Sequence, residues 1–246
     1  MKVSILLTFY GDRYYQLKRS LPFLLNQTYE DYEIVFIDDG LMNEQDLSPR
    51  ELLDHPKIKY FQLRVGRPLP RAPNKALRFG FTNCDGEFII TSQPELLVPY
   101  DAVETMVTQG NLERRNVAIQ YHLTLEQIHY LFSGDMSWRR DFSKIKKVPN
   151  FMDTMTPWGN TNYNRPERRS HFSFSGSTRD RFEEYMIPDT DEWMREDAYV
   201  HELERSRKEL SVPIDIETFH QEHERVYGTR TDRSLRIKRI RESHFQ

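Results

Sequence analysis

Cysteine is almost absent from this 246-residue sequence, in which Cys84 is the single one. One thiol cannot form an internal disulfide, and such usage is typical of a reducing compartment. No apolar run approaches the ~18 residues that a membrane-spanning helix needs. The apolar start of the chain is short and is interrupted by Asp12 and Arg13, so it predicts a first strand and not a signal peptide. We therefore expect a cytoplasmic protein.

A strong net charge is also lacking, since the formal charge is −3. The field of the whole molecule therefore does not attract polyanions. The C-terminal residues 229–246 differ, because they form a basic tail that contains Arg230, Arg233, Arg236, Lys238, Arg239 and Arg241. Such a run is typical of a solvated helix face or a flexible end. A peripheral contact with a membrane surface, or a contact with nucleic acid, is the alternative.

Apolar residues nonetheless gather in clusters of strand length, which predicts a buried core. In the first half, strands are expected at Val3–Phe9, Glu33–Ile37, Ile58–Leu63 and Glu87–Thr91, with helices at Tyr14–Asn26 and Asn74–Thr82. This alternation predicts an α/β fold with parallel strands and right-handed crossovers. In the second half, we expect a strand at Asn116–His122, a helix at Thr124–Phe132, a long loop at Met136–Arg169, a helix at Trp193–Leu210 and a last strand at Val212–Phe219.

Polar loops follow three of the predicted parallel strands, at Thr8–Asp12, Asp38–Gly40 and Gln93–Glu95. Ligands of such sheets bind beyond the carboxyl ends of the strands, so these loops should surround one crevice. A carboxylate in that position, such as Asp38, can accept hydrogen bonds from a uracil ring or a ribose hydroxyl. An ordinary Asp-Gly turn explains the same residues.

Three segments together resemble the opening of family 2 glycosyltransferases: Ser4–Tyr10, Leu21–Tyr29 and Glu33–Gly40. Arg71–Ala76 and Gly86–Ile90 are similar to later segments of that family, and the resemblance is good over about the first hundred residues. It implies a GT-A fold, a single twisted and mostly parallel sheet flanked by helices. The GT-A domain would span residues 1–228, with a Rossmann-like nucleotide-sugar-binding half at 1–100 and an acceptor and catalytic half at 101–228.

The resemblance also implies an activity, the transfer of a sugar from a nucleoside-diphosphate sugar to an acceptor hydroxyl with inversion. The donor is expected to be UDP-linked, and the acceptor is a glycan, a lipid-linked sugar or another hydroxyl compound. The residues expected to contact the donor are Thr8, Phe9, Tyr10, Asp38, Asp39, Arg71, Asn74, Gln93, Gly176, Arg225 and Arg230. Gly176 belongs to Phe174–Ser177, which resembles a small-residue loop of this family.

The family's metal motif, Asp-x-Asp, is replaced here by Gln93-Pro94-Glu95. Glu95 keeps one carboxylate for a hard cation such as Mg²⁺ or Mn²⁺, whereas Gln93 keeps an oxygen without a charge. His220 and His223 follow the last predicted strand and would add imidazole ligands, which suit Mn²⁺ better. The two histidines would share one face if their segment is helical. Alternatively, Pro94-Glu95 only turns the chain and the histidines are solvated.

Glu196-Asp197 resembles the family's Glu-Asp motif, in which the Asp is the general base. Asp197 would take the proton of the acceptor hydroxyl, and Glu196 would orient the acceptor. Acidic residues at a helix N-terminus are also favoured by the helix dipole alone.

Three other functions stay open. An inactive nucleotide-sugar or carbohydrate-binding module is compatible with Gln93. A glycosyltransferase that acts on nucleic acid is suggested only by the basic tail. A nucleotidyltransferase that makes nucleotide sugars needs a Gly-rich basic loop after the first strand to bind the triphosphate. This chain has one glycine, Gly11, and the acidic Asp12 there, which disfavours that function.

Overall fold

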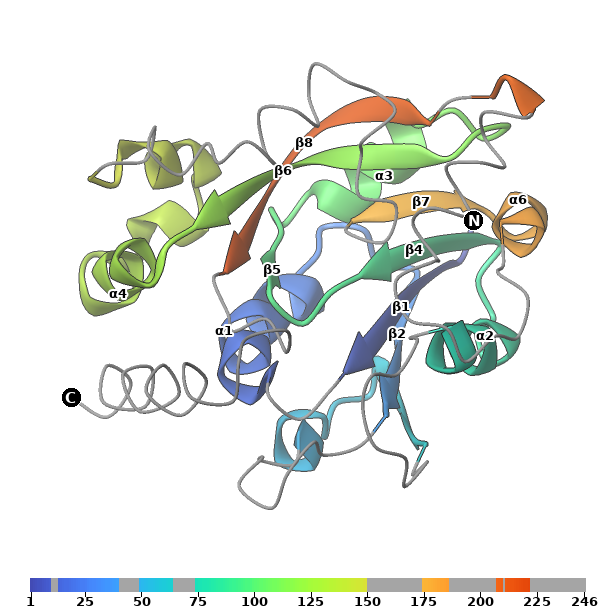
Figure 1. Ribbon diagram of the computed structural model, residues 1–246, viewed down its shortest axis with the longest axis horizontal. Helices are drawn as coiled ribbons and strands as arrows, with labels where there is room; N and C mark the ends of the chain where they lie inside the picture. Colours follow the sequence, from blue (N-terminus) through green and yellow to red (C-terminus); the bar gives the residue numbers. More distant parts are fainter. Residues whose placement is uncertain are drawn as a thin grey trace, which may run out of the picture.

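The computed structural model describes residues 1–9, 13–39, 49–63, 74–149, 174–185, 207–209 and 211–221. These residues form one eight-stranded sheet in the order β3-β2-β1-β4-β7-β6-β8-β5, with helices packed against it (Figure 1). The strands are β1 Val3–Phe9, β2 Tyr32–Asp38, β3 Ile58–Gln62, β4 Phe88–Ser92, β5 Leu96–Leu97, β6 Asn116–Leu123, β7 Ser175–Thr178 and β8 Val212–Gln221. The α-helices are α1 Tyr14–Leu25, α2 Asn74–Thr82, α3 Ala102–Gln109, α4 Leu125–Ser133 and α6 Arg179–Glu184. Three 3-10 turns are η2 Pro49–Leu52, η3 Met136–Arg139 and η4 Phe142–Lys147.

The first four long strands pair in parallel as the alternation of strands and helices predicts, with β1 between β2 and β4, and β3 outside β2. Strands β1, β2 and β4 are buried almost throughout because helices cover both faces of this part of the sheet. Ile5 and Leu7 of β1 pack in one core cluster with Leu17 of α1. Leu6, which points to the opposite face, packs in a second cluster with Leu77 of α2. Strand β1 thus contributes side chains to both core clusters, one on each face of the sheet.

Strand β7 joins the two halves of the sheet, and it lies antiparallel to both β4 and β6. The small-residue loop expected at 174–177 is therefore wrong, because Ser175–Thr178 is a strand inside the sheet. Gly176 is buried there, and a Cβ atom on it would lie 2.5 Å from Cε1 of Phe88. The glycine is required by the close approach of a phenyl ring and not by a turn.

The far side of the sheet contains β6, β8 and β5. Strand β8 runs parallel to β6 with a bulge near Ala118 and Ile119, and the short β5 lies antiparallel to β8. Strand β8 extends two residues beyond the predicted Val212–Phe219, so His220 lies in a strand. The idea that a helix carries His220 is therefore wrong, and His223 lies outside the described residues. The long loop expected from Met136 begins instead with η3 and η4.

No helix among the described residues is long and apolar enough to cross a membrane.

Candidate active site

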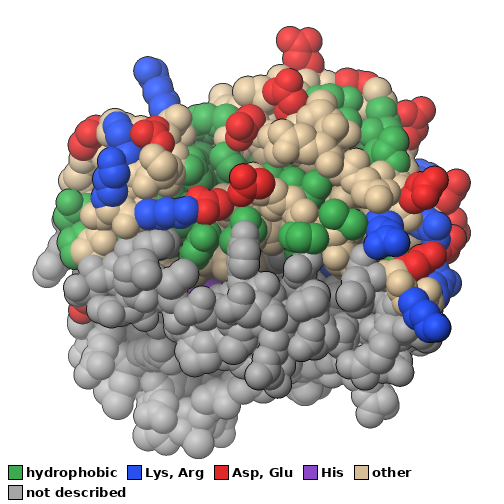
Figure 2. All heavy atoms as spheres, turned by 90° about the horizontal axis from the view of Figure 1, so that it is seen from above, with side chains coloured by type: hydrophobic (Ala, Val, Ile, Leu, Met, Phe, Trp, Pro, Cys, Tyr) green, Lys and Arg blue, Asp and Glu red, His purple; other side chains and the backbone are tan. Residues whose placement is uncertain are grey.

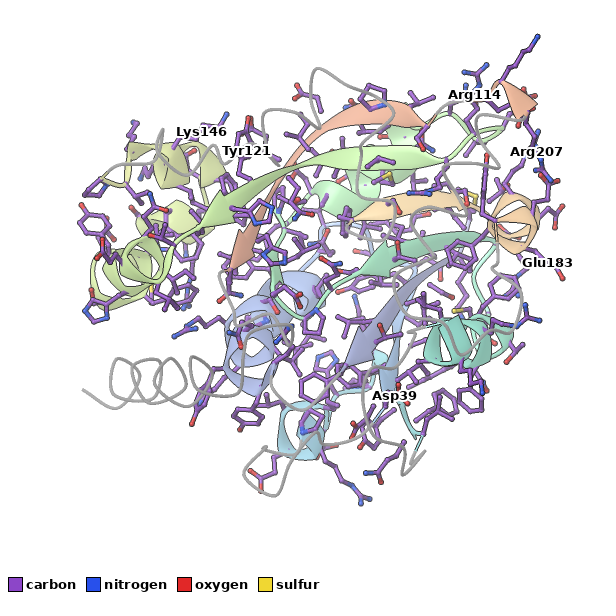
Figure 3. The ribbon with its side chains drawn as sticks, in the orientation of Figure 1. Asp39, Arg114, Tyr121, Lys146, Glu183 and Arg207 are labelled. Carbon is purple, nitrogen blue, oxygen red and sulfur yellow. The ribbon has the colours of Figure 1, made fainter. Side chains whose placement is uncertain are left out.

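The carboxyl ends of β1 and β2 meet at one edge of the sheet, as the sequence predicts. Phe9 and Asp38 are register partners, and the N–H of Asp39 donates to the carbonyl oxygen of Phe9 over 3.0 Å. Thr8 is half-buried beside Ile37, and the ring of Phe9 is fully buried. Phe9 is therefore a core residue that shapes the edge. Asp39 lies just past the carboxyl end of β2 (Figure 3).

Asp38 is buried at this edge, with 1% of its surface exposed. The hydroxyl of Tyr60 in β3 donates to Oδ2 of Asp38 over 2.6 Å. A hydrogen bond of this kind orients the carboxylate, because a buried charged oxygen needs a donor. Tyr60 is a site residue that sequence reasoning missed. Its signal was present, since it is the register partner of Phe36, two residues before Asp38 on the same face of the neighbouring strand.

A second polar cluster lies where β4 turns into β5. Glu95 is 7% exposed, and its Oε1 lies 3.4 Å from Nε2 of His220 and 3.7 Å from Nε of Arg13. The turn is held from two sides. The N–H of Gln221 donates to the carbonyl oxygen of Glu95 over 2.9 Å, and the hydroxyl of Ser20 in α1 donates to that of Pro94. The Glu95 carboxylate thus has a fixed position between an imidazole and a guanidinium group.

The pairing of β5 with β8 explains why Glu95 and His220 meet. His220 is the register partner of Leu96, which follows Glu95 directly. Sequence reasoning brought these two residues together but missed Arg13, which precedes α1. Arg13 stands between the first strand and the first helix, a position whose basic side chain could have indicated an anion site.

His122 of β6 extends this cluster. It is the register partner of His220, and the two imidazole rings are tilted with centroids 4.7 Å apart. Nε2 of His122 lies 3.4 Å from Nε2 of Gln120, two residues earlier in the same strand. Sequence reasoning missed His122 because it reads as an ordinary strand residue until the partner of β6 is known.

The separation of Glu95 and His220 can be compared with that of two ligands of one divalent ion. Two ligands about 2.1 Å from an octahedral ion lie about 3 Å apart, so the observed 3.4 Å suits a shared ion. Among the described residues, no third His, Cys, Asp or Glu side chain joins them to complete a set of three. Mg²⁺ is commonly bound by one or two side chains together with substrate phosphates and water. The pair therefore fits part of a metal site that the donor would complete.

The remaining predicted residues have different positions. Gln93 is half-buried and its carbonyl oxygen accepts the N–H of Leu96 over 3.1 Å, so its backbone closes the turn before β5. Asn74 is the first residue of α2. Gly176 lies within the sheet, as described above. The other predicted residues lie outside the described part of the chain: Tyr10, Arg71, Glu196, Asp197, His223, Arg225 and Arg230.

Comparison of the chain with known families gives a match over residues 4–123 to the family described as "Glycosyl transferase family 2". The match covers nearly half of the chain and includes the four parallel strands β1 to β4. The matched glycosyltransferase segment contains Asp38, Glu95 and His122, and it ends with the last residue of β6. No curated protein matches the chain in sequence.

Solved structures similar to this chain include S. aureus TarS 1–349 in complex with UDP-GlcNAc, with a TM-score of 0.56 and 11% identity. That match covers 99% of this chain and 66% of the other. S. aureus TarS 1–349 itself gives a TM-score of 0.53 at 13% identity, over 90% of this chain and 60% of the other. The chain thus spans about two thirds or less of these structures. At such identities the likeness shows the fold, which is GT-A.

Proposed function

We propose that this chain transfers a sugar from a UDP-sugar to a hydroxyl group of its acceptor, with inversion at the anomeric carbon. The observation that supports this most is the cluster of Glu95, His220 and Arg13 at the carboxyl edge of a family 2 glycosyltransferase domain. A carboxylate, an imidazole and a guanidinium group gathered at that edge suit the diphosphate of a nucleotide sugar. The domain would span residues 1–228, followed by the basic tail at 229–246.

The nucleoside would bind at the edge formed by β1 and β2. Asp38, which Tyr60 orients, would accept a hydrogen bond from the uracil ring or a ribose hydroxyl, and Thr8 would line the same pocket. A UDP donor is supported by the similar structure of S. aureus TarS 1–349, which is a complex with UDP-GlcNAc. Arg71, Asn74, Arg225 and Arg230 remain proposed donor contacts.

The diphosphate would lie against Glu95, His220 and Arg13. When bound, Mn²⁺ or Mg²⁺ would neutralise the charge that develops on the leaving diphosphate. The guanidinium of Arg13 is an always-ionised donor beside the same carboxylate and would contribute in the same direction. Glu95 would then have two tasks, which are to bind the ion and to hold Arg13 and His220 in place.

Asp197 would act as the general base and Glu196 would orient the acceptor. The acceptor is proposed to be a glycan, a lipid-linked sugar or another hydroxyl compound. A buried single cysteine agrees with the reducing cytoplasm as the place of action.

The experiment that tests this proposal measures nucleotide release from a panel of nucleotide sugars, with EDTA, Mg²⁺ or Mn²⁺ added. We expect metal-dependent release of UDP from one donor. Glu95→Gln and His220→Gln should each lower the rate about 100-fold, since each removes a group that stabilises the leaving diphosphate. Glu217→Gln is the matched control. It makes the same change as Glu95→Gln and lies in β8 with His220, but its carboxylate contacts Tyr121 and Lys146.

Equal release by wild type and Glu95→Gln would overturn the assignment of the site. Binding of a UDP-sugar without release or transfer, in the presence of an acceptor panel, would identify the chain as a binding module instead.

A further inference from the structure

A hollow of about 440 Å³ lies beside α4, and its lining contains none of the residues assigned to the donor above. It is formed by the last turn of α4 and by the 3-10 turns η3 and η4, which pack against each other. Its lining residues are Tyr130, Leu131, Ser133, Gly134, Asp135, Ser137, Trp138, Lys144, Lys147 and Val148. None of them has a part in the donor site.

The walls combine an apolar floor with an exposed aromatic ring. Trp138 is 3% exposed and its Nε1–H donates to the carbonyl oxygen of Leu131 over 2.9 Å, so its indole is a core group. Tyr130 is 56% exposed, so its ring is accessible to a ligand at the rim of the hollow. A flat and solvated ring at the rim of a hollow suits the C–H face of a sugar.

The charged residues that line the hollow are two lysines and one acid, which leaves one net positive charge. These are Lys144, Lys147 and Asp135. The N–H and hydroxyl of Ser137 donate to the two oxygens of Asp135 over 2.9 and 2.6 Å, which orients this carboxylate but leaves its charge in place. Lys144 reaches the hydroxyl oxygen of Ser137 over 3.0 Å, which keeps its ammonium group at the wall. In the space-filling view, Lys and Arg side chains lie at the left of the molecule with Asp and Glu side chains between them (Figure 2).

Lys146 provides an internal comparison. It stands between the two lining lysines in sequence, yet it pairs with Glu217 and lies over the ring of Tyr121 (Figure 3). Its charge is therefore used to attach η4 to strands β6 and β8. Lys144 and Lys147 instead line the hollow. They also lie near Asp141, and the hydrogen bonds from Ser143 together with these two lysine charges hold the pKa of Asp141 below its ordinary value.

Helix α4 separates the hollow from the cluster of Glu95, His220 and His122. Helix α4 begins at Leu125, three residues after His122 in β6, and the hollow lies at the other end of this helix. A helix of nine residues is about 13 Å long. A ligand that reaches both places must therefore be longer than one sugar.

We propose that this hollow binds an anionic saccharide unit of an extended acceptor, one helix length from the transferred sugar. The anionic group, a carboxylate or a phosphate, pairs with Lys144 and Lys147, and the sugar ring packs on Tyr130. That the ligand is the acceptor rests on the proposed glycosyltransferase function. Binding of the saccharide itself does not, so it is tested without donor or turnover.

The test titrates the full chain with trigalacturonic acid, glucose 6-phosphate, maltotriose and inorganic phosphate, and follows binding by NMR of the protein. We expect trigalacturonic acid or glucose 6-phosphate to bind more tightly than both neutral maltotriose and inorganic phosphate. Which of the two binds identifies the anionic group. The double variant Lys144→Gln/Lys147→Gln should weaken that binding about fivefold or more, as should Tyr130→Ala. Lys146→Gln is the matched control and should leave it unchanged.

Thermal unfolding of each variant establishes that it is folded. Equal binding of all four compounds, or equal weakening by Lys146→Gln, would mean non-specific attraction and would overturn the proposal. Undetectable binding of both anionic sugars would overturn it as well. Such a failure leaves UDP release and its loss in Glu95→Gln untouched, so the two proposals fail separately.

Discussion

Oε1 of Glu95 lies 3.4 Å from Nε2 of His220, although one residue follows β4 and the other is near the end of β8. The two-residue strand β5 brings them together by pairing with β8. Because Gln221 and Ser20 hold the same turn through backbone carbonyls, the carboxylate does not depend on a ligand for its position. A preformed group of this kind costs little reorganisation when the donor binds.

His122 is predicted to position His220. Its ring packs against that of His220, so replacement by Gln should free the His220 side chain to turn away from Glu95. Outer residues of this kind typically change metal affinity or activity 10- to 100-fold. We expect His122→Gln to raise the concentration of Mn²⁺ needed for half-maximal UDP release about tenfold.

The control for His122 is His129→Gln, the same change at an exposed position of α4. A purely structural role of His122 would lower thermal stability but leave the Mn²⁺ requirement as in wild type. That result would contradict the prediction.

Gly176 is predicted to be a packing residue. A Cβ atom there would lie 2.5 Å from Cε1 of Phe88 and 3.1 Å from Cγ1 of Ile90, both buried. Overpacking of this kind costs about 1–3 kcal/mol. Gly176→Ala should lower the free energy of unfolding in urea by that amount, and Phe88→Leu in the same chain should recover part of it. Loss of UDP release without loss of stability would instead favour the donor contact expected from the family.

The first half of the fold was predictable because each of its strands can be recognised from its own short stretch of sequence. Residues such as Ile5, Leu7, Ile34 and Phe36 are buried on a sheet covered on both faces, and their apolar runs end in turn residues. The carboxyl-edge residues Asp38 and Glu95 were found for the same reason, since both directly follow or flank such runs.

The second half was less predictable because its contacts are long-range. Strand β7 has four residues, and serine and glycine do not indicate a central strand. Its position depends on Phe88 and Asn116, which are distant in sequence. Tyr60, Arg13 and His122 were missed for a related reason, since each acquires its role only from a neighbouring strand or turn.

Cys84 is predicted to be unreactive in the native protein. Burial raises the pKa of its thiol from 9.0 to about 12, and the thiol lies 3.3 Å from the carbonyl oxygen of Gly80. The thiolate is the nucleophile, so native protein at pH 8 should not react with a disulfide reagent within minutes, whereas urea-unfolded protein should react at once. Glu113→Cys, which adds an exposed thiol, is the positive control. One rapid equivalent in native wild type would contradict the prediction.

Glu33 is predicted to make folding sensitive to acid. It is buried at the amino end of β2, where Ser4 Oγ and the N–H of Asp85 both donate to its Oε1 over 2.6 Å, and Lys59 lies 2.8 Å from its Oε2. Burial alone would raise the pKa of this carboxyl. The hydrogen bonds from Lys59, Ser4 and Asp85 outweigh burial, so the pKa lies below its ordinary 4.5.

The sign of the effect follows from this lowered pKa. The stabilisation by ionised Glu33 is complete above pH 4.5, and it is lost as the pH falls through the lower pKa of the folded state. Glu33→Gln should therefore lower the free energy of unfolding at pH 7 by about 1–3 kcal/mol, the cost of unsatisfied buried partners. The difference from wild type should shrink as the pH approaches 3 in urea titrations. Glu87→Gln, an exposed carboxylate beside β4, should show neither effect, and a pH-independent difference for Glu33→Gln would mean that its charge contributes nothing.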